Sequence, residues 1–338
     1  MKHFATLTLL GFVLLSGIAL ATVDDDETQG IDLSYHLPAG VTEHFRIETT
    51  FVDRSSLFEL TSHRVDYVDV KTLELSNDGA AKVELTFTRV AIENEIAENE
   101  RSPLQVFGDR LLRTLEGRQL QLTLDTKGRI TAVEGVADAV AALAETIVEE
   151  RKPSTDERAE LTASLVATIG ALWSDASVRD LYQPLFLVRP VKPPTPGSEW
   201  SVAWQSPYGV PTITVHQDLT YKLDGVTPGS VNISFRADDT AKFVVAELPE
   251  DASAQTRTHH DKTAAQTLLS ASFTGLSVIS RTDGLPISRS LTRTIKAHAG
   301  RSPRLKINGR RTWSKWSILR VAPTEAPDAR PDAPPDDR

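Results

Sequence analysis

The stretch Ile213–Leu223, ITVHQDLTYKL, decides the fold class of this 338-residue chain. Its apolar side chains occupy alternate positions, with Gln217 as the polar exception: Ile213, Val215, Leu219, Tyr221 and Leu223. A period of two over this length is typical of a half-buried antiparallel strand. The apolar parity is therefore predicted to face an interior, and we expect Leu219 to lie at its centre.

The same alternation recurs on both sides of this stretch. Further apolar alternations occupy Val83–Phe87, Leu120–Leu124 and Val231–Phe235. Glycine-containing turns separate strand-like runs at Asn77–Gly79, Asp125–Gly128 and Thr282–Gly284. Glycine supplies the positive φ that tight hairpin turns require. Most of the chain is thus predicted to form antiparallel hairpins.

Three amphipathic helices are predicted near the middle. Ser102 caps the first, which begins at Pro103 and ends at Gly117. The second carries apolar residues at helical spacing from Val136 to Ile147, and the third does so from Leu161 to Leu172. Ser154 and Glu157 precede the third helix with the spacing of a capping box. We expect these helices to lie against a sheet.

These patterns predict a β-rich α+β fold: antiparallel curved sheet or sheets in two halves, with amphipathic helices inserted between them. The N-terminal half spans 33–188, a proline-rich connector spans 189–198, and the C-terminal half spans 199–321. One curved sheet and two separate domains both fit the pattern. An acidic leader, 22–32, and a Pro/Asp-rich tail, 322–338, lack the apolar residues that a core needs and are predicted to be disordered.

Residues 1–21 have the layout of a secretory signal peptide, with a basic head, an apolar run and a small-residue site that predicts cleavage after Ala21. The alternative is a retained membrane anchor, because the uncharged run is only just long enough to span a bilayer. We expect cleavage, no stable membrane span after it, and export to the periplasm or the cell exterior.

Composition excludes several classes of function. The chain has no cysteine, which removes disulfides, thiolate nucleophiles and cysteine metal sites. The net charge of −9 argues against nucleic-acid binding. No catalytic, phosphate-binding or dinucleotide motif is present, and the adjacent His259 and His260 are a poor metal pair. We therefore expect no cofactor, no metal and no enzymatic activity.

A resemblance supports the expectation of export. The segment Tyr35–Gly40 opens a strand after a polar leader, and Leu120–Val133 gives a strand, a turn and a short strand before Gly135. Gly197-Ser198-Glu199-Trp200 follows a proline-rich approach, and Asp283-Gly284 precedes a long hairpin. In this order the chain resembles, over Leu33 to Val321, a family of exported bacterial proteins frequent in planctomycetes and known only as a domain of unknown function. Ser198 and Glu199 depart from the family's Gly-Asp-x-Trp pattern. The resemblance implies export and a β-rich fold, and carries over no catalytic residue.

Two hypotheses of function follow. In the first, the chain is a binding protein that holds a lipid or another apolar small molecule between sheet and helices, mainly by apolar contacts. The predicted ligand wall is formed by Leu161, Leu165 and Ile169 on one side and by Trp200 and Trp204 on the other. In the second hypothesis, the chain is a structural or interaction module that binds a protein of the cell envelope. An apolar cavity would favour the first hypothesis, and a fully packed interior the second.

Overall fold

The computed structural model describes residues 30–54, 59–94, 109–110, 112–208, 213–237, 241–245, 267–298 and 310–323, to which all structural statements below refer. Several expectations lie outside these residues. They are the signal peptide with its cleavage site at Ala21, residues 22–29 of the acidic leader, the start of the helix predicted at Pro103, the His259–His260 pair and residues 324–338 of the tail.

The described residues form twelve strands, most of which follow one another as antiparallel hairpins. The N-terminal half supplies β1 (Thr42–Arg54), β2 (Glu59–Leu75), β3 (Ala81–Asn94), β4 (Gln119–Leu124) and β5 (Ile130–Glu134). The C-terminal half supplies β6 (Glu199–Tyr208), β7 (Ile213–Val226), β8 (Ser230–Ala237), β9 (Lys242–Val245), β10 (Thr267–Ser280), β11 (Pro286–His298) and β12 (Arg310–Val321). Gly79, Gly128 and Gly284 all adopt positive φ in the predicted turns.

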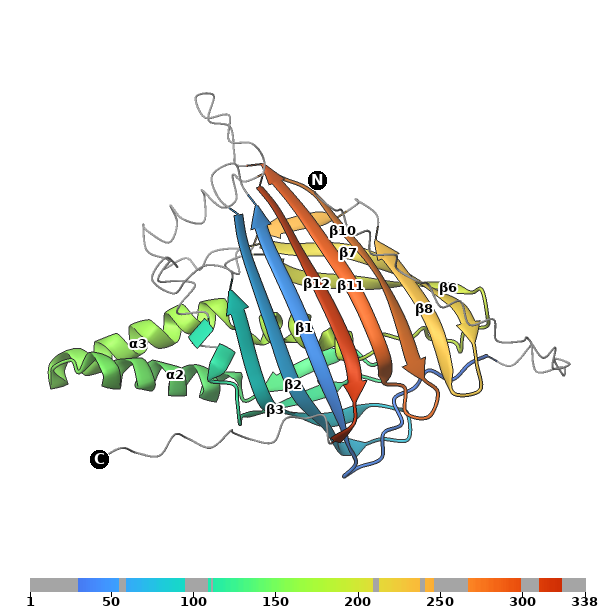
Figure 1. Cartoon of the computed structure of the whole chain (residues 1–338), viewed down its shortest axis with the longest axis horizontal. Helices are drawn as coiled ribbons and strands as arrows, with labels where there is room; N and C mark the ends of the chain where they lie inside the picture. The colour runs from blue at the N-terminus through green and yellow to red at the C-terminus, as the bar shows by residue number, and fades with distance from the viewer. Residues whose placement is uncertain are drawn as a thin grey trace, which may run out of the picture.

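All the described strands join one antiparallel sheet, which is one of the two arrangements that the sequence left open. The strand order is β5-β4-β3-β2-β1-β12-β11-β10-β8-β7-β6, and β9 pairs with β7 off this path. The two halves meet at the centre, where β1 pairs with β12 from His44 opposite Val321 to Arg54 opposite Arg311. Figure 1 shows these central strands side by side. The strands nearest the middle of the sequence, β5 and β6, are therefore the two free edges.

The apolar parity of β7 faces the interior, as predicted. Val215, Leu219, Tyr221 and Leu223 are all buried, with Leu219 only 1% exposed. The polar exception, Gln217, is also buried, and its side-chain amide donates to the Ala271 carbonyl oxygen at 2.7 Å. A hydrogen bond to the backbone of β10 thus compensates for placing an amide in the core.

Four helices lie between β5 and β6 in the described part of the chain: α2 (Val136–Arg151), α3 (Thr155–Leu172), α4 (Asp175–Tyr182) and the short 3-10 helix η3 (Gln183–Leu185). The predictions of α2 and α3 are confirmed, and α3 begins at the expected capping box. The expectation that each helix lies against a sheet is wrong for α3, which packs mainly on α2 and leaves most of its surface exposed (Figure 1).

By length and composition alone, the helical stretch Thr155–Leu185 could cross a membrane, and 19% of its most apolar window is buried. Core helices of soluble proteins meet the same criteria. Ser174 caps a new helix within this stretch by accepting a hydrogen bond from the Ser177 N–H, so the stretch is divided into α3, α4 and η3.

The segment from Tyr182 to Val188, which begins at the last residue of α4, fills the space inside the curved sheet. Tyr182, Leu185 and Phe186 pack into the buried cluster of the N-terminal half, while Leu187 and Val188 pack into that of the C-terminal half. All five are at most 4% exposed. The interior is therefore largely occupied by the chain itself.

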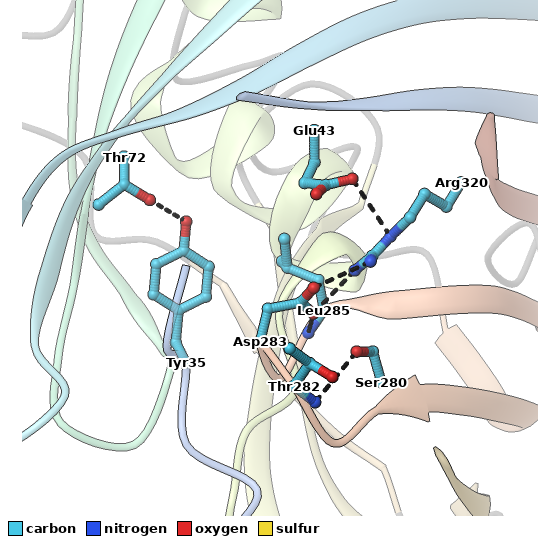
Figure 2. Close-up of polar contacts among 8 residues, drawn as sticks. All are labelled: Tyr35, Glu43, Thr72, Ser280, Thr282, Asp283, Leu285 and Arg320. Carbon is cyan, nitrogen blue, oxygen red and sulfur yellow. Dashed lines mark hydrogen bonds and ion pairs between the residues drawn. The ribbon is translucent and has the colours of Figure 1, made fainter. Parts of the chain in front are cut away.

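The turn around Asp283 joins the N-terminal segment to the sheet (Figure 2). The Arg320 guanidinium donates to both Asp283 carboxylate oxygens, at 2.8 and 2.9 Å, and its Nε lies 3.7 Å from Glu43. Tyr35 and Thr72 share a hydrogen bond of 2.6 Å between their hydroxyls. The Tyr35 bond and a bond of 2.9 Å from the His36 N–H to the Asp283 carbonyl hold the segment before β1 across one end of the sheet.

Candidate functional site

The two free edges of the sheet, β5 and β6, lie on opposite sides of α4. This helix contacts both β5 and β6, so it bridges the gap that the open sheet would otherwise leave. We call this junction the seam. Edge strands carry backbone groups that no neighbouring strand pairs, so a seam is a place where ligands and partners can bind.

A pocket of about 250 Å³ lies in the seam. Its floor is formed by buried side chains, three of them aliphatic: Ile130, Val188 and Val202. Trp204 adds an aromatic, partly buried wall. Exposed residues form the rim: Arg129, Ala176, Ala203 and Gln205. The volume is close to the lower end of small-molecule sites, which begin at about 300 Å³.

A polar cluster fixes α4 against β6. The Asp180 carboxylate accepts from the Trp204 indole N–H at 3.1 Å, from the Ser206 hydroxyl at 2.8 Å and from the Arg293 guanidinium at 3.0 Å. The Arg293 guanidinium also lies 5.3 Å from the centre of the Trp316 ring. Asp180 and Arg293 are only 11% and 16% exposed, so their ion pair is partly desolvated. The cluster fixes the orientation of the Trp204 indole in the pocket.

On the opposite side, Gln183 and Arg179 join the helical segment to β5. Gln183 accepts from the Ile130 N–H at 2.8 Å and donates to the Gly128 carbonyl at 3.0 Å. Arg179 donates from one terminal nitrogen to the Thr131 carbonyl at 3.3 Å, along the free edge of β5. Its Nε is shielded from solvent and has no hydrogen-bond partner among the described residues.

The five residues of the predicted ligand wall fall into two separate places. Ile169 is fully buried in the N-terminal cluster, Leu165 packs against that cluster, and Leu161 is partly buried on α3. Trp200 and Trp204 pack against the C-terminal cluster. Trp204 lines the seam pocket, while the Trp200 ring stacks on Tyr221 at 5.4 Å. The structure thus places Trp204 at the candidate site and does not bring the α3 residues to it.

The sequence analysis missed the pocket's charge and its helix. Arg129 and Arg179 both line the pocket, although they lie far apart in the sequence and neither belongs to a charged run. Helix α4 carries a recognisable start signal, since Ser174 precedes Asp175 and the apolar Val178 and Tyr182 lie four positions apart. Reading this signal would have indicated the helix, but not its position between two sheet edges.

No group of three or more His, Cys, Asp or Glu side chains with metal-binding geometry occurs in the described part of the chain. The seam pocket holds one carboxylate, Asp180, and its oxygens are already bound by Trp204, Ser206 and Arg293. What the pocket offers chemically is apolar contact, an aromatic ring and two guanidinium groups.

The comparisons with known proteins give a family without an assigned activity. The model of a family of unknown function, DUF6263, matches residues 78–284, more than half of the chain. This agrees with the expectation of a family of unknown function, over a shorter range than Leu33 to Val321. No curated protein matches the sequence.

Solved structures show only distant likeness. A structure titled "Lipid-protein interactions in lipovitellin" aligns with 88% of this chain at 8% identity and a TM-score of 0.46, and this chain spans only 26% of it. A DUF1329 family protein from Desulfovibrio piger aligns over 84% of this chain and 88% of its own, at 9% identity and a TM-score of 0.22. At such TM-scores neither likeness supports an inference about function.

Proposed function

We propose that this chain, which belongs to DUF6263, a family of unknown function, is a non-catalytic protein that binds an apolar small molecule in the seam pocket. The observation that carries the proposal is the floor of that pocket. Ile130, Val188 and Val202 present buried aliphatic side chains there, beside the ring of Trp204. Seven of the thirteen lining residues are polar or charged, and small-molecule sites combine apolar contact with polar groups that orient the ligand.

The position of the pocket supports the same function. Elsewhere inside the sheet, the segment from Tyr182 to Val188 fills the space with its own side chains. The ligand is therefore expected at the seam, between α4 and the edge of β6. This differs from the ligand position that the sequence analysis predicted, between the sheet and a helical wall of Leu161, Leu165 and Ile169.

Export is part of the proposal and rests on residues 1–21. The apolar run ends at Ala19-Leu20-Ala21, where a signal peptidase recognises small side chains. The intact mass of the protein recovered from its native compartment tests this step. We expect a chain that begins at Thr22, and a mass that still includes Met1 to Ala21 would contradict cleavage.

A neutral dye that brightens in apolar surroundings, N-phenyl-1-naphthylamine, tests binding in the pocket. We expect saturable binding at one site by the wild-type protein. Ala176 lies exposed on the rim, so Ala176→Trp should fill the mouth without disturbing the core and weaken binding at least about tenfold.

The matched control is Ala163→Trp, because Ala163 is an exposed alanine of α3 that does not line the pocket. It should bind the dye as the wild type does. Wild-type protein that binds no dye would exclude apolar binding and leave a structural or interaction role in the cell envelope. Equal loss in both variants would exclude the seam as the site.

A further inference from the structure

We infer that the ligand of the seam pocket is an amphiphile with an anionic end, a carboxylate or a phosphate, which the guanidinium groups of Arg129 and Arg179 bind. This inference rests on the proposed function and specifies the chemical class of its ligand. It departs from the sequence-based expectation of mainly apolar contact, because the two arginines come together only in the folded chain.

The charge of the pocket is the first argument. Asp180 is the one carboxylate among the lining residues, and Arg293 already pairs with it at 3.0 Å. Neither Arg129 nor Arg179 forms an ion pair with any described residue. The lining therefore carries two positive charges that Asp180 does not balance. A site with an uncompensated pair of cations favours an anionic ligand.

The hydrogen-bonding state of Arg179 is the second argument. Its one contact in the described chain is the 3.3 Å bond to the Thr131 carbonyl. That bond holds the guanidinium against the β5 edge through one terminal nitrogen. The Nε is shielded from solvent and is therefore closed to a ligand as well, so an anion would bind the terminal nitrogens. Carboxylate or phosphate oxygens suit such forked donors best.

The division of the pocket into two regions is the third argument. Val188, Val202 and the Trp204 ring lie along β6 and the segment leading to it, while Arg129 and Arg179 lie on the β5 and α4 sides, together with the third floor residue, Ile130. An apolar ligand alone would leave the two guanidinium charges without an anionic partner. A ligand with an apolar chain and an anionic end satisfies both regions at once.

Displacement of bound N-phenyl-1-naphthylamine by three ligands of equal chain length tests the inference: decanoate, decyl phosphate and decanol. We expect the wild-type protein to bind each anion at least about tenfold more tightly than decanol at low ionic strength. A preference for decanoate alone identifies a carboxylate as the anionic end, and a preference for decyl phosphate alone identifies a phosphate. Equal binding of all three by a protein that binds the dye overturns the inference while leaving the apolar site intact.

The double variant Arg129→Gln/Arg179→Gln should lose the preference for anions and keep the affinity for decanol, which shows that it is folded. The matched control is Arg281→Gln, because Arg281 is also a surface arginine that donates to a backbone carbonyl, that of Thr227 at 3.2 Å. It should keep the full preference. An undiminished preference in the double variant overturns the role of the two arginines.

Discussion

Each half of the sheet places one buried arginine on its inner face, and the two arginines are held differently. Arg64 on β2 donates to Asp66 at 2.6 Å and to the Tyr182 hydroxyl at 2.8 Å. Arg289 on β11 donates to the Pro184 carbonyl at 2.9 Å and lies 4.9 Å from the centre of the Phe235 ring. Both hold the segment that follows α4, but only Arg64 has a carboxylate partner in the described chain.

The C-terminal interior also leaves more polar atoms without partners. Among the described residues these are Tyr221 Oη, Ser277 Oγ, Arg289 Nε and Trp316 Nε1. Burial lowers the pKa of Arg289, with Tyr221 opposing that shift. Tyr221 and Arg289 lie beside one another and interact electrostatically without a well-formed hydrogen bond. The described N-terminal interior thus bonds its buried arginine more completely than the C-terminal interior does, although it too holds a buried hydroxyl without a partner, that of Thr49.

The largest expected effect comes from a substitution that breaks the contacts of Arg64 with Asp66 and Tyr182. Asp66→Asn leaves the Arg64 charge buried without a counter-ion and should lower the free energy of unfolding by about 3–5 kcal/mol. Arg289→Met should change it by less than about 1.5 kcal/mol in either direction, because that charge has no ion pair to lose. Urea denaturation of both variants measures the difference, and equal losses would contradict it.

The next largest effect is a difference in the free energy of unfolding between variants of two fully buried tyrosines. Tyr182→Phe removes the acceptor of the Arg64 bond and should cost about 1–3 kcal/mol. Tyr221→Phe removes a hydroxyl that lies beside the Arg289 guanidinium without a well-formed hydrogen bond, so its cost should be smaller, below about 1 kcal/mol. Chemical denaturation checks both values. A cost above about 1 kcal/mol at Tyr221 would mean that this hydroxyl is bonded in solution.

The smallest expected effect is on the way the free energy of unfolding changes at alkaline pH. Burial raises the pKa of Tyr221 above its usual value of about 10, so its ionisation is easier in the unfolded chain. The stability that this group contributes is therefore complete below pH 10 and is lost as the pH rises above it. The loss is about 1.4 kcal/mol per pH unit.

Tyr221→Phe should remove this contribution. Burial also raises the pKa of Tyr35 and Tyr182, which the variant retains. The unfolding free energy of the variant should therefore fall less steeply above pH 10 than that of the wild type. Parallel slopes for the two proteins would show that Tyr221 is not shielded from solvent.

The strands could be predicted because their signal is local. The alternation around Leu219 identifies its buried face from a few neighbouring residues, and the same holds for the other hairpins. The pairing of His44 with Val321 joins the two ends of the folded region, and no local pattern indicates it. The sequence therefore predicted a curved sheet in two halves without showing that its centre is formed by the first and last strands.

The candidate site was harder to predict for the same reason. Trp204 was recognised as an aromatic wall because of its strand parity, but its neighbours in the pocket come from other elements. Arg129 precedes β5 and Arg179 lies on α4, and only the folding of the sheet edges around that helix brings them together. Leu165 and Ile169 have the apolar spacing of a ligand wall, yet they pack against the N-terminal cluster.

The most direct test of the central claim is the position of a bound ligand in a crystal structure. Crystals grown with ω-bromodecanoate should show an anomalous bromine peak over the apolar floor near Val202 and Trp204, with the carboxylate within hydrogen-bonding distance of Arg179. A peak at any other place, or a seam without ligand in protein that binds decanoate in solution, would contradict the account.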